Sequence, residues 1–127
     1  MDSNYKEEIM KIIKFEDIIA WQKSQNLAVD VYSAFRDLKD WDFRNQICRA
    51  SASISNNIAE GFDRSSNADF VRFLYISLAS ASEVKSMLYL AFRLGYLELQ
   101  TQTILLENVS EISKIITGLI KSLKPNI

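Results

Sequence analysis

Histidine is absent from the 127-residue chain, which also has only one cysteine, one proline and three glycines. Without histidine, the chain cannot form a di-iron site from Glu-x-x-His motifs or a Ser-His or Cys-His nucleophile. One cysteine is too few for structural zinc, and the isolated glycines form no phosphate-binding loop. With 48% hydrophobic residues, the composition excludes a disordered chain, and scarce proline and glycine disfavour an all-β fold. We expect no metal and no cofactor.

Catalysis by carboxylates alone would need two acidic side chains that meet in one pocket. Glu60 and Glu83 lie in segments rich in hydrophobic residues and are the best candidates. Helix-end capping or a buried hydrogen bond explains each of them more simply. We therefore predict that the protein is not an enzyme and has no small-molecule substrate.

Signals for export or membrane insertion are missing. The first residues are polar and of mixed charge, with no apolar signal core behind them. The longest apolar run covers residues 87–92, far short of the roughly 20 residues that a membrane helix needs. Cys48 cannot form an internal disulfide, and a small buried side chain is the simplest interpretation of it. The sequence predicts a soluble cytoplasmic protein with no membrane partner.

Four segments carry apolar residues at spacings of three and four, which is typical of helices, and none alternates as a strand does. In the first segment, residues 18–39, we expect the buried seam to be Ile18, Trp21, Ala28, Tyr32 and Phe35. The other expected seams are Phe43, Ile47, Ala50, Ile54 and Ile58; Phe70, Leu74, Ser77, Ala81, Val84, Leu88 and Ala91; and Leu105, Val109, Ile112, Ile116, Leu119 and Leu123. Short connections between long helices predict an all-α, antiparallel up-down-up-down four-helix bundle.

The helix boundaries are predicted from capping residues. Asp42 is the expected N-cap of the second helix, and Ser66 begins a capping-box-like start of the third. Gly61 and Gly95 are expected to end the second and third helices in the left-handed conformation. For the fourth helix, Glu98 and Thr101 both remain candidate N-caps.

The chain is long enough for one domain. We assign residues 15–124 to a single four-helix bundle, residues 1–14 to an N-terminal arm that is partly helical or frayed, and residues 125–127 to a C-terminal tail.

Apolar residues extend beyond the seams. Further hydrophobic positions are Ala20, Leu27, Val29, Val31, Ala34 and Leu38 in the first helix, Val71, Phe73, Tyr75, Ile76, Leu78, Tyr89, Leu90 and Phe92 in the third, and Ile104, Leu106, Ile115 and Ile120 in the fourth. A monomer that left all of them exposed would carry larger apolar patches than such proteins normally tolerate. We expect a homo-oligomer; the alternative is a monomer whose core absorbs these wide stripes.

The charges nearly cancel, with 15 basic and 16 acidic residues and a net charge of −1. Arginines dominate the central half of the chain, and Arg49, Arg64 and Arg72 are the candidate contacts to nucleic acid or another partner. Acidic neighbours around Arg64 and Arg72 favour the simpler interpretation that these arginines form ion pairs. An oligomer would still gather arginines from several subunits.

Several motifs, taken together, resemble one family. They are FEDIIAWQK at residues 15–23, QICRA at 46–50, SISNNIAEGF at 53–62, FVRFL at 70–74 and LGYL at 94–97. The sequence is similar in this way to the 23S ribosomal RNA intervening sequence protein family, also called the four helix bundle protein family. Asn57, Glu60 and Gly61 belong to its most recognisable motif. Many relatives have proline where this chain has Ser55, so we expect a straighter second helix here.

The resemblance implies a left-handed antiparallel four-helix bundle that assembles as a homopentamer and has no known catalytic activity. Some members are encoded within 23S ribosomal RNA genes, which implies an association with ribosomal RNA. The family is also similar to the basic, pentameric accessory variability proteins of diversity-generating retroelements, which bind nucleic acid; the mildly acidic composition here departs from them. We expect a homopentamer that associates with RNA or a ribonucleoprotein; the alternative is an oligomeric protein–protein scaffold with no nucleic-acid role.

Overall fold

Four long helices follow one another along the chain in the computed structural model, which describes residue 12 and residues 14–127. They are α2 (Ile19–Ala34), α3 (Trp41–Phe62), α4 (Asn67–Arg93) and α5 (Leu99–Leu123). Two short 3-10 helices, η1 (Phe15–Asp17) and η2 (Lys124–Asn126), lie before α2 and after α5. The described residues contain no strand, so the predicted all-α four-helix class is confirmed.

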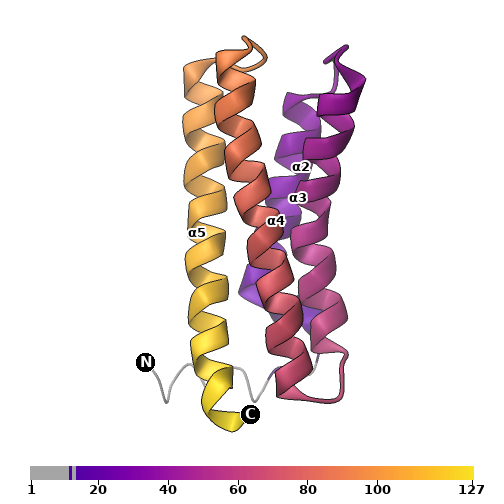
Figure 1. Cartoon of the computed structure of the whole chain (residues 1–127), viewed down its shortest axis with the longest axis vertical. Helices are drawn as coiled ribbons and strands as arrows, with labels where there is room; N and C mark the ends of the chain where they lie inside the picture. The colour runs from indigo at the N-terminus through magenta and orange to yellow at the C-terminus, as the bar shows by residue number, and fades with distance from the viewer. Residues whose placement is uncertain (1–11, 13) are drawn as a thin grey trace.

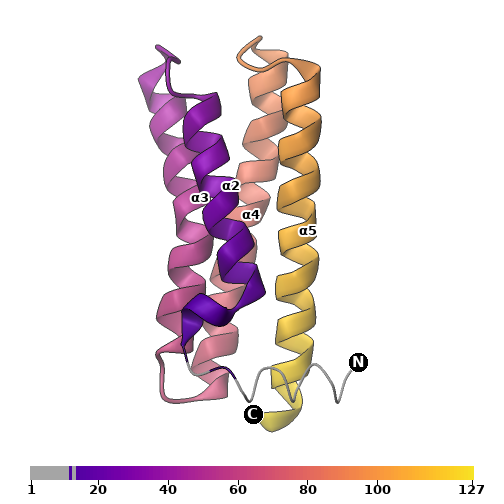
Figure 2. The same ribbon diagram turned by 180° about the vertical axis from the view of Figure 1, so that it is seen from behind.

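The helices run alternately up and down (Figure 1), and the view from behind in Figure 2 shows the same order. Each helix packs against its neighbours in sequence, and α2 also packs against α5, which closes the ring. Within the described part of the chain, the diagonal pairs α2–α4 and α3–α5 do not approach each other.

The domain boundaries remain predictions, since most of the expected arm, residues 1–14, lies outside the described residues. At the other end, α5 stops at Leu123, and Pro125 lies within η2. The first long helix is shorter than predicted: α2 ends at Ala34, and the chain turns at residues 35–37.

The predicted seams of α3, α4 and α5 are all buried. The predicted seam of the first helix was wrong at three positions: Tyr32 is 51% exposed, and Trp21 and Ala28 are only half-buried. Its end residues, Ile18 and Phe35, are buried as predicted. The buried face of α2 instead carries Ala20, Ser24, Leu27 and Val31, with Phe35 just beyond its end. Both rows of α2 are apolar, so the spacing alone does not decide which one faces the core; packing against α3 and α5 does.

Of the surplus apolar positions, several belong to the core of the single chain: Ala20, Leu27, Val31, Val71, Phe73 and Ile120. Others remain exposed, namely Val29, Tyr75, Ile76, Tyr89, Leu90, Phe92 and Ile104. A single chain therefore buries some of these additional apolar side chains and leaves the others exposed.

One of the predicted N-caps was wrong. Asp40, not Asp42, caps α3, because its Oδ1 accepts a hydrogen bond from the Phe43 amide (3.2 Å). Ser66 caps α4 as predicted, by accepting from the Asp69 amide. For α5, the structure places the N-cap at Glu98.

Gly95 ends α4 as predicted, with a φ of 78°. The Tyr96 amide donates to the Ala91 carbonyl (2.8 Å) and the Gly95 amide to the Phe92 carbonyl (3.0 Å). This is the Schellman arrangement.

Gly61 does not end α3; it lies inside the helix, which continues to Phe62. Among the described residues, only Gly95 has a positive φ. A Cβ added at Gly61 would lie 2.5 Å from the Phe73 Cβ on α4. The residue is therefore needed for close approach of α3 to α4, and the left-handed conformation plays no part.

Replacing Gly61 by alanine should destabilise the protein by about 1–3 kcal/mol, because the new methyl group forces α3 and α4 apart. Gly118→Ala is the matched control: a Cβ there meets nothing within 4 Å, and alanine in a helix interior is favoured by up to about 1 kcal/mol. Denaturant unfolding of both variants measures the difference. Equal stability of Gly61→Ala and wild type would contradict the packing role.

Two connections at the same end of the bundle are joined by the Tyr96 hydroxyl, which donates to Asp40 Oδ2 (2.6 Å). This bond and the Phe43 amide together lower the pKa of the Asp40 carboxyl. A carboxylate with a lowered pKa in the folded state stabilises the protein above its unfolded pKa, about 3.9, and loses that contribution as the pH falls through the folded value.

We predict that Tyr96→Phe lowers the thermal unfolding midpoint at pH 7, because it removes the hydroxyl but keeps the ring contact with Phe43. The gap to wild type should narrow as the pH falls through the lowered pKa of Asp40, because the carboxylate then takes up a proton. Tyr89→Phe, at an exposed position without a hydroxyl partner among the described residues, is the control and should leave the midpoint unchanged. A gap that stays equally large as the protein is titrated to its acid unfolding would contradict this interpretation.

Candidate functional site

A groove of about 770 Å³ lies between α2 and α3, toward their connection. Tyr32 and Arg36 line it from α2 and the connection after it. From α3 it is lined by Arg44, Asn45, Cys48, Arg49, Ala52, Ser53, Asn56 and Asn57.

Helical spacing brings these side chains to one side of the bundle. Asn45 and Arg49 are four residues apart on α3, and residues at this spacing share a helix face. Tyr32 lies on α2, and Arg36 lies in the turn that follows it. The opposite face of α3 is fixed in the core by its buried isoleucines, Ile47, Ile54 and Ile58. The polar row of α3 therefore faces outward beside α2.

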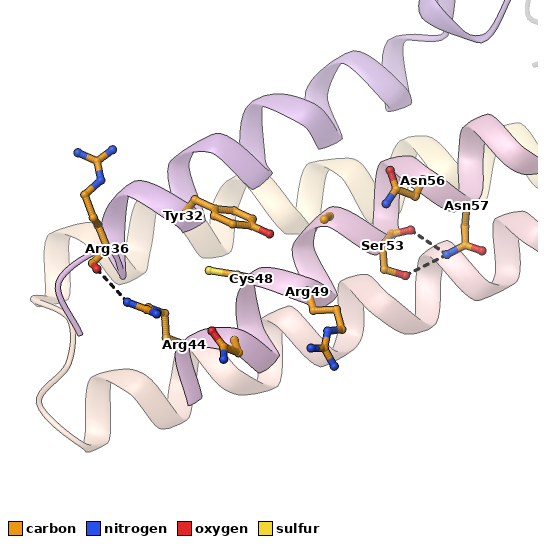
Figure 3. A pocket seen from close by; sticks show the side chains of 10 residues that line it. Tyr32, Arg36, Arg44, Cys48, Arg49, Ser53, Asn56 and Asn57 are labelled. Carbon is orange, nitrogen blue, oxygen red and sulfur yellow. Dashed lines mark hydrogen bonds between the residues drawn. The ribbon is translucent and has the colours of Figure 1, made fainter. Parts of the chain in front are cut away.

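The groove concentrates positive charge in a chain whose net charge is −1. It contains three arginines, and its lining, all of it within the described residues, includes no acidic side chain. Arg44 is held in place because its Nη1 donates to the Arg36 carbonyl (3.3 Å; Figure 3). Arg36, Arg44 and Arg49 have no ion pair among the described residues. Arg49 also lines an adjoining hollow that includes Asp42 and Glu83. On the side of the groove itself, like charges without an acidic side chain in the lining favour an anionic ligand.

The far end of the groove is ordered by hydrogen bonds. The Asn57 amide nitrogen donates to the Ser53 carbonyl (2.8 Å) and to Ser53 Oγ (2.9 Å; Figure 3). Ser53 Oγ also shares a hydrogen bond with Ser80 Oγ on α4 (2.8 Å). Both donor positions of Asn57 are thus used, and its Oδ1 remains as an acceptor.

Cys48 lies in the groove but is buried. Burial raises the pKa of its thiol, and the charge of Arg44 acts in the opposite direction without cancelling this effect. A thiol with a raised pKa stays protonated at neutral pH and is a poor nucleophile. The geometry thus gives Cys48 a packing role.

The three arginines predicted as contacts are not brought together. Arg49 lies in the groove, whereas Arg64 and Arg72 flank the connection between α3 and α4 at the other end of α3. Their guanidinium carbons each lie 4.7 Å from the centre of the Phe73 ring. Arg64 pairs with Glu60 (3.0 Å), and Arg72 Nε lies 3.6 Å from an Asp69 oxygen. Their charges are thus largely balanced within the chain.

The family-motif residues Asn57, Glu60 and Gly61 all make contacts within the fold: Asn57 to Ser53, Glu60 to Arg64, and Gly61 to Phe73. Glu83, the other candidate for carboxylate chemistry, accepts from Gln46 (3.3 Å). Gln46 and Glu60 are separated by about 21 Å along α3 at 1.5 Å per residue. Glu60 and Glu83 therefore do not converge on one pocket.

Ser55 stands within an unbroken α3. Its hydroxyl donates to the Ala52 carbonyl (3.3 Å) and accepts from Gln25 of α2 (2.9 Å). This side chain, absent in a relative with proline there, thus links the two helices that form the groove.

Sequence reasoning missed most of the groove, including Tyr32, Arg36, Arg44, Asn45 and Asn56. A signal was present in α3, where Asn45, Arg49, Ala52 and Asn56 form a row without large apolar side chains at spacings of four, three and four. Tyr32 was not identified as a groove residue because its position fits the apolar spacing predicted for the buried seam of the first helix.

Metal binding and membrane insertion find no support in the described part of the chain. No group of three or more His, Cys, Asp or Glu side chains there could hold a metal ion. None of the described helices is both long and apolar enough to span a membrane.

Comparison with known proteins places the fold in a family. Residues 16–118 match the family described as 23S rRNA-intervening sequence protein. A crystal structure of a protein of unknown function from Bacteroides thetaiotaomicron VPI-5482, assigned to the S23 ribosomal protein family, is similar with a TM-score of 0.76. It is 29% identical, over 81% of this chain and 96% of that one. No curated protein matches. Because the family match extends over most of its length, the chain belongs to the 23S rRNA-intervening sequence protein family.

Proposed function

We propose that this protein is a non-enzymatic homo-oligomer, a pentamer, that associates with RNA or a ribonucleoprotein in the cytoplasm. The observation that carries the RNA proposal is the groove between α2 and α3, which is lined by Arg36, Arg44 and Arg49 and by no acidic side chain. Arginine is suited to phosphate because its planar guanidinium donates two parallel hydrogen bonds.

The remaining apolar surface supports self-association. An apolar corner, defined here as Tyr89, Leu90, Phe92, Leu94 and Leu99, surrounds the connection between α4 and α5. Each of these side chains is at least 39% exposed. Large exposed apolar side chains gathered around one connection are typical of a contact between proteins.

Two observations support a non-enzymatic, cytoplasmic role. The groove offers no activated nucleophile, since Cys48 has a raised pKa. Glu60 pairs with Arg64, and Glu83 of α4 accepts from Gln46, which lies about 21 Å from Glu60 along α3, so the two carboxylates are far apart. The free cysteine is compatible with a reducing compartment.

The alternative is an oligomeric protein–protein scaffold without a nucleic-acid role. It is favoured by the same apolar corner and by Trp41, which is 65% exposed at the start of α3. Aromatic side chains of this kind are common anchors in protein interfaces. RNA binding separates the two proposals.

The oligomer is tested by light scattering on the purified protein, which should give five times the chain mass of 14.6 kDa. Leu90→Glu combined with Leu99→Glu should shift the mass toward a single subunit, because charged side chains do not tolerate burial in an apolar interface. Val29→Glu, an exposed apolar position on α2, is the control. A wild-type peak near 14.6 kDa would overturn the oligomer proposal. An unchanged mass for the double variant would show that the apolar corner is not part of the interface.

The RNA proposal is tested by titrating binding against salt. Contacts to phosphate predict a steep loss of affinity between about 50 and 200 mM salt. Arg36→Gln with Arg49→Gln should lower the log–log salt slope by about 0.7 for each phosphate that is no longer neutralised. Arg64→Gln with Arg72→Gln removes the same charge from positions already paired with acids and should change the slope less. Absence of binding at about 50 mM salt would favour the scaffold.

A further inference from the structure

We propose that the groove between α2 and α3 accepts single-stranded RNA, with one base stacked on Tyr32 and adjacent phosphates held by Arg36, Arg44 and Arg49. This inference rests on the proposed RNA association and specifies the form of RNA that the site selects. Proteins that bind single strands combine a positive groove along the backbone with an aromatic platform for the bases.

The arginines are placed to follow a strand. Arg44 and Arg49 are five residues apart on α3, about 7.5 Å along the helix axis and roughly 140° around it. Arg36 lines the groove from the connection after α2, but its guanidinium points away from Arg44 and Arg49 (Figure 3) and reaches the groove only by a change of rotamer. The hydrogen bond from Arg44 Nη1 to the Arg36 carbonyl (3.3 Å) orients one edge of that guanidinium. The other N–H groups of the Arg44 guanidinium remain available to a phosphate. Positive charge thus lines the α3 wall of the groove, with Arg36 at its edge.

Tyr32 provides the aromatic platform. Its neighbours Val31 and Phe35 are buried, at 0% and 1% exposure, whereas Tyr32 is 51% exposed and lines the groove. Figure 3 shows its ring between α2 and α3, on the same side as Cys48. The core therefore does not need this ring, and no aromatic partner within the described chain occupies it. A base would find an aromatic surface beside guanidinium groups.

Amide side chains supply groups that contact base edges. Asn45 and Asn56 are exposed in the groove, and each offers a donor and an acceptor. Asn57 is oriented by its two hydrogen bonds to Ser53, which leave its Oδ1 as an acceptor. Bases in a single strand expose these edges, whereas a duplex hides them in base pairs.

The size of the groove favours a strand over a duplex. Its volume of about 770 Å³ lies in the range of pockets that hold one small organic ligand. It thus has room for a nucleotide or two. A base in a duplex is already paired and stacked on its neighbours, so it is not free to stack on Tyr32. The inference predicts a preference for unpaired RNA.

The test measures the affinity of the full chain for a labelled single-stranded RNA of about 12 nucleotides, within the usual range of site sizes, and for its duplex. Single-stranded RNA should bind at least about tenfold more tightly than the duplex. Tyr32→Leu should weaken single-strand binding about tenfold, as expected for the loss of one base–aromatic stack. Tyr32→Phe keeps the ring and should bind as wild type does.

Tyr32→Leu should leave the salt slope, the unfolding midpoint and the oligomer mass unchanged, because it removes a ring and no charge. Equal binding by Tyr32→Leu and wild type, or equal affinity for duplex RNA, would overturn this inference. The proposed RNA association would then still stand if Arg36→Gln with Arg49→Gln lowers the salt slope. A changed oligomer mass in Tyr32→Leu would show that Tyr32 is a contact between subunits, which would overturn the inference. Tight competition by a free mononucleotide with the labelled RNA would identify a mononucleotide as the ligand and would overturn it as well. Failure of any RNA to bind would overturn both proposals.

Discussion

The close approach of α3 to α4 governs how the other parts of the bundle are arranged. Gly61 allows it, since any side chain there would collide with Phe73. Along the same contact, the buried Ser77 hydroxyl donates to the Ile54 carbonyl (2.9 Å), and Ser53 bonds to Ser80 (2.8 Å). Small side chains thus let two helices pack tightly, and their hydroxyls satisfy polar groups that this packing buries.

The α3–α4 contact also decides what α3 presents to the solvent. With Ile47, Ile54 and Ile58 directed into the core, the row that carries Asn45, Arg49 and Asn56 is turned outward beside α2. The arginines of the groove are therefore separated from the acidic residues that neutralise Arg64 and Arg72 near the α3–α4 connection. A nearly neutral chain can in this way carry a locally positive surface.

Much of the fold was predictable, because the apolar residues at spacings of three and four in α3, α4 and α5 are the ones that the structure buries. The exception was α2, where Leu27 and Val31 compete with Trp21 and Tyr32, and only contacts with the neighbouring helices distinguish the two rows. Capping shows the same limit: Asp40 and Asp42 are equally good N-caps in sequence, but Tyr96, distant in the chain, bonds to Asp40. Local patterns predict elements; tertiary contacts select between equivalent local patterns.

The candidate site was predictable only in part for the same reason. Arg49 was identified from the sequence, but its grouping with Arg36 depends on how α2 lies on α3. Charge along a sequence does not show which charges remain unbalanced in the fold.

The proposal that the unbalanced arginines of the groove meet RNA can be examined at the arginines themselves, by NMR of their Nε–H groups during titration with single-stranded RNA. We predict that the resonances of Arg36, Arg44 and Arg49 shift with RNA concentration, while those of Arg64 and Arg72, already paired with acids, stay in place. Shifts confined to Arg64 and Arg72, or no shift at any arginine, would contradict the proposal.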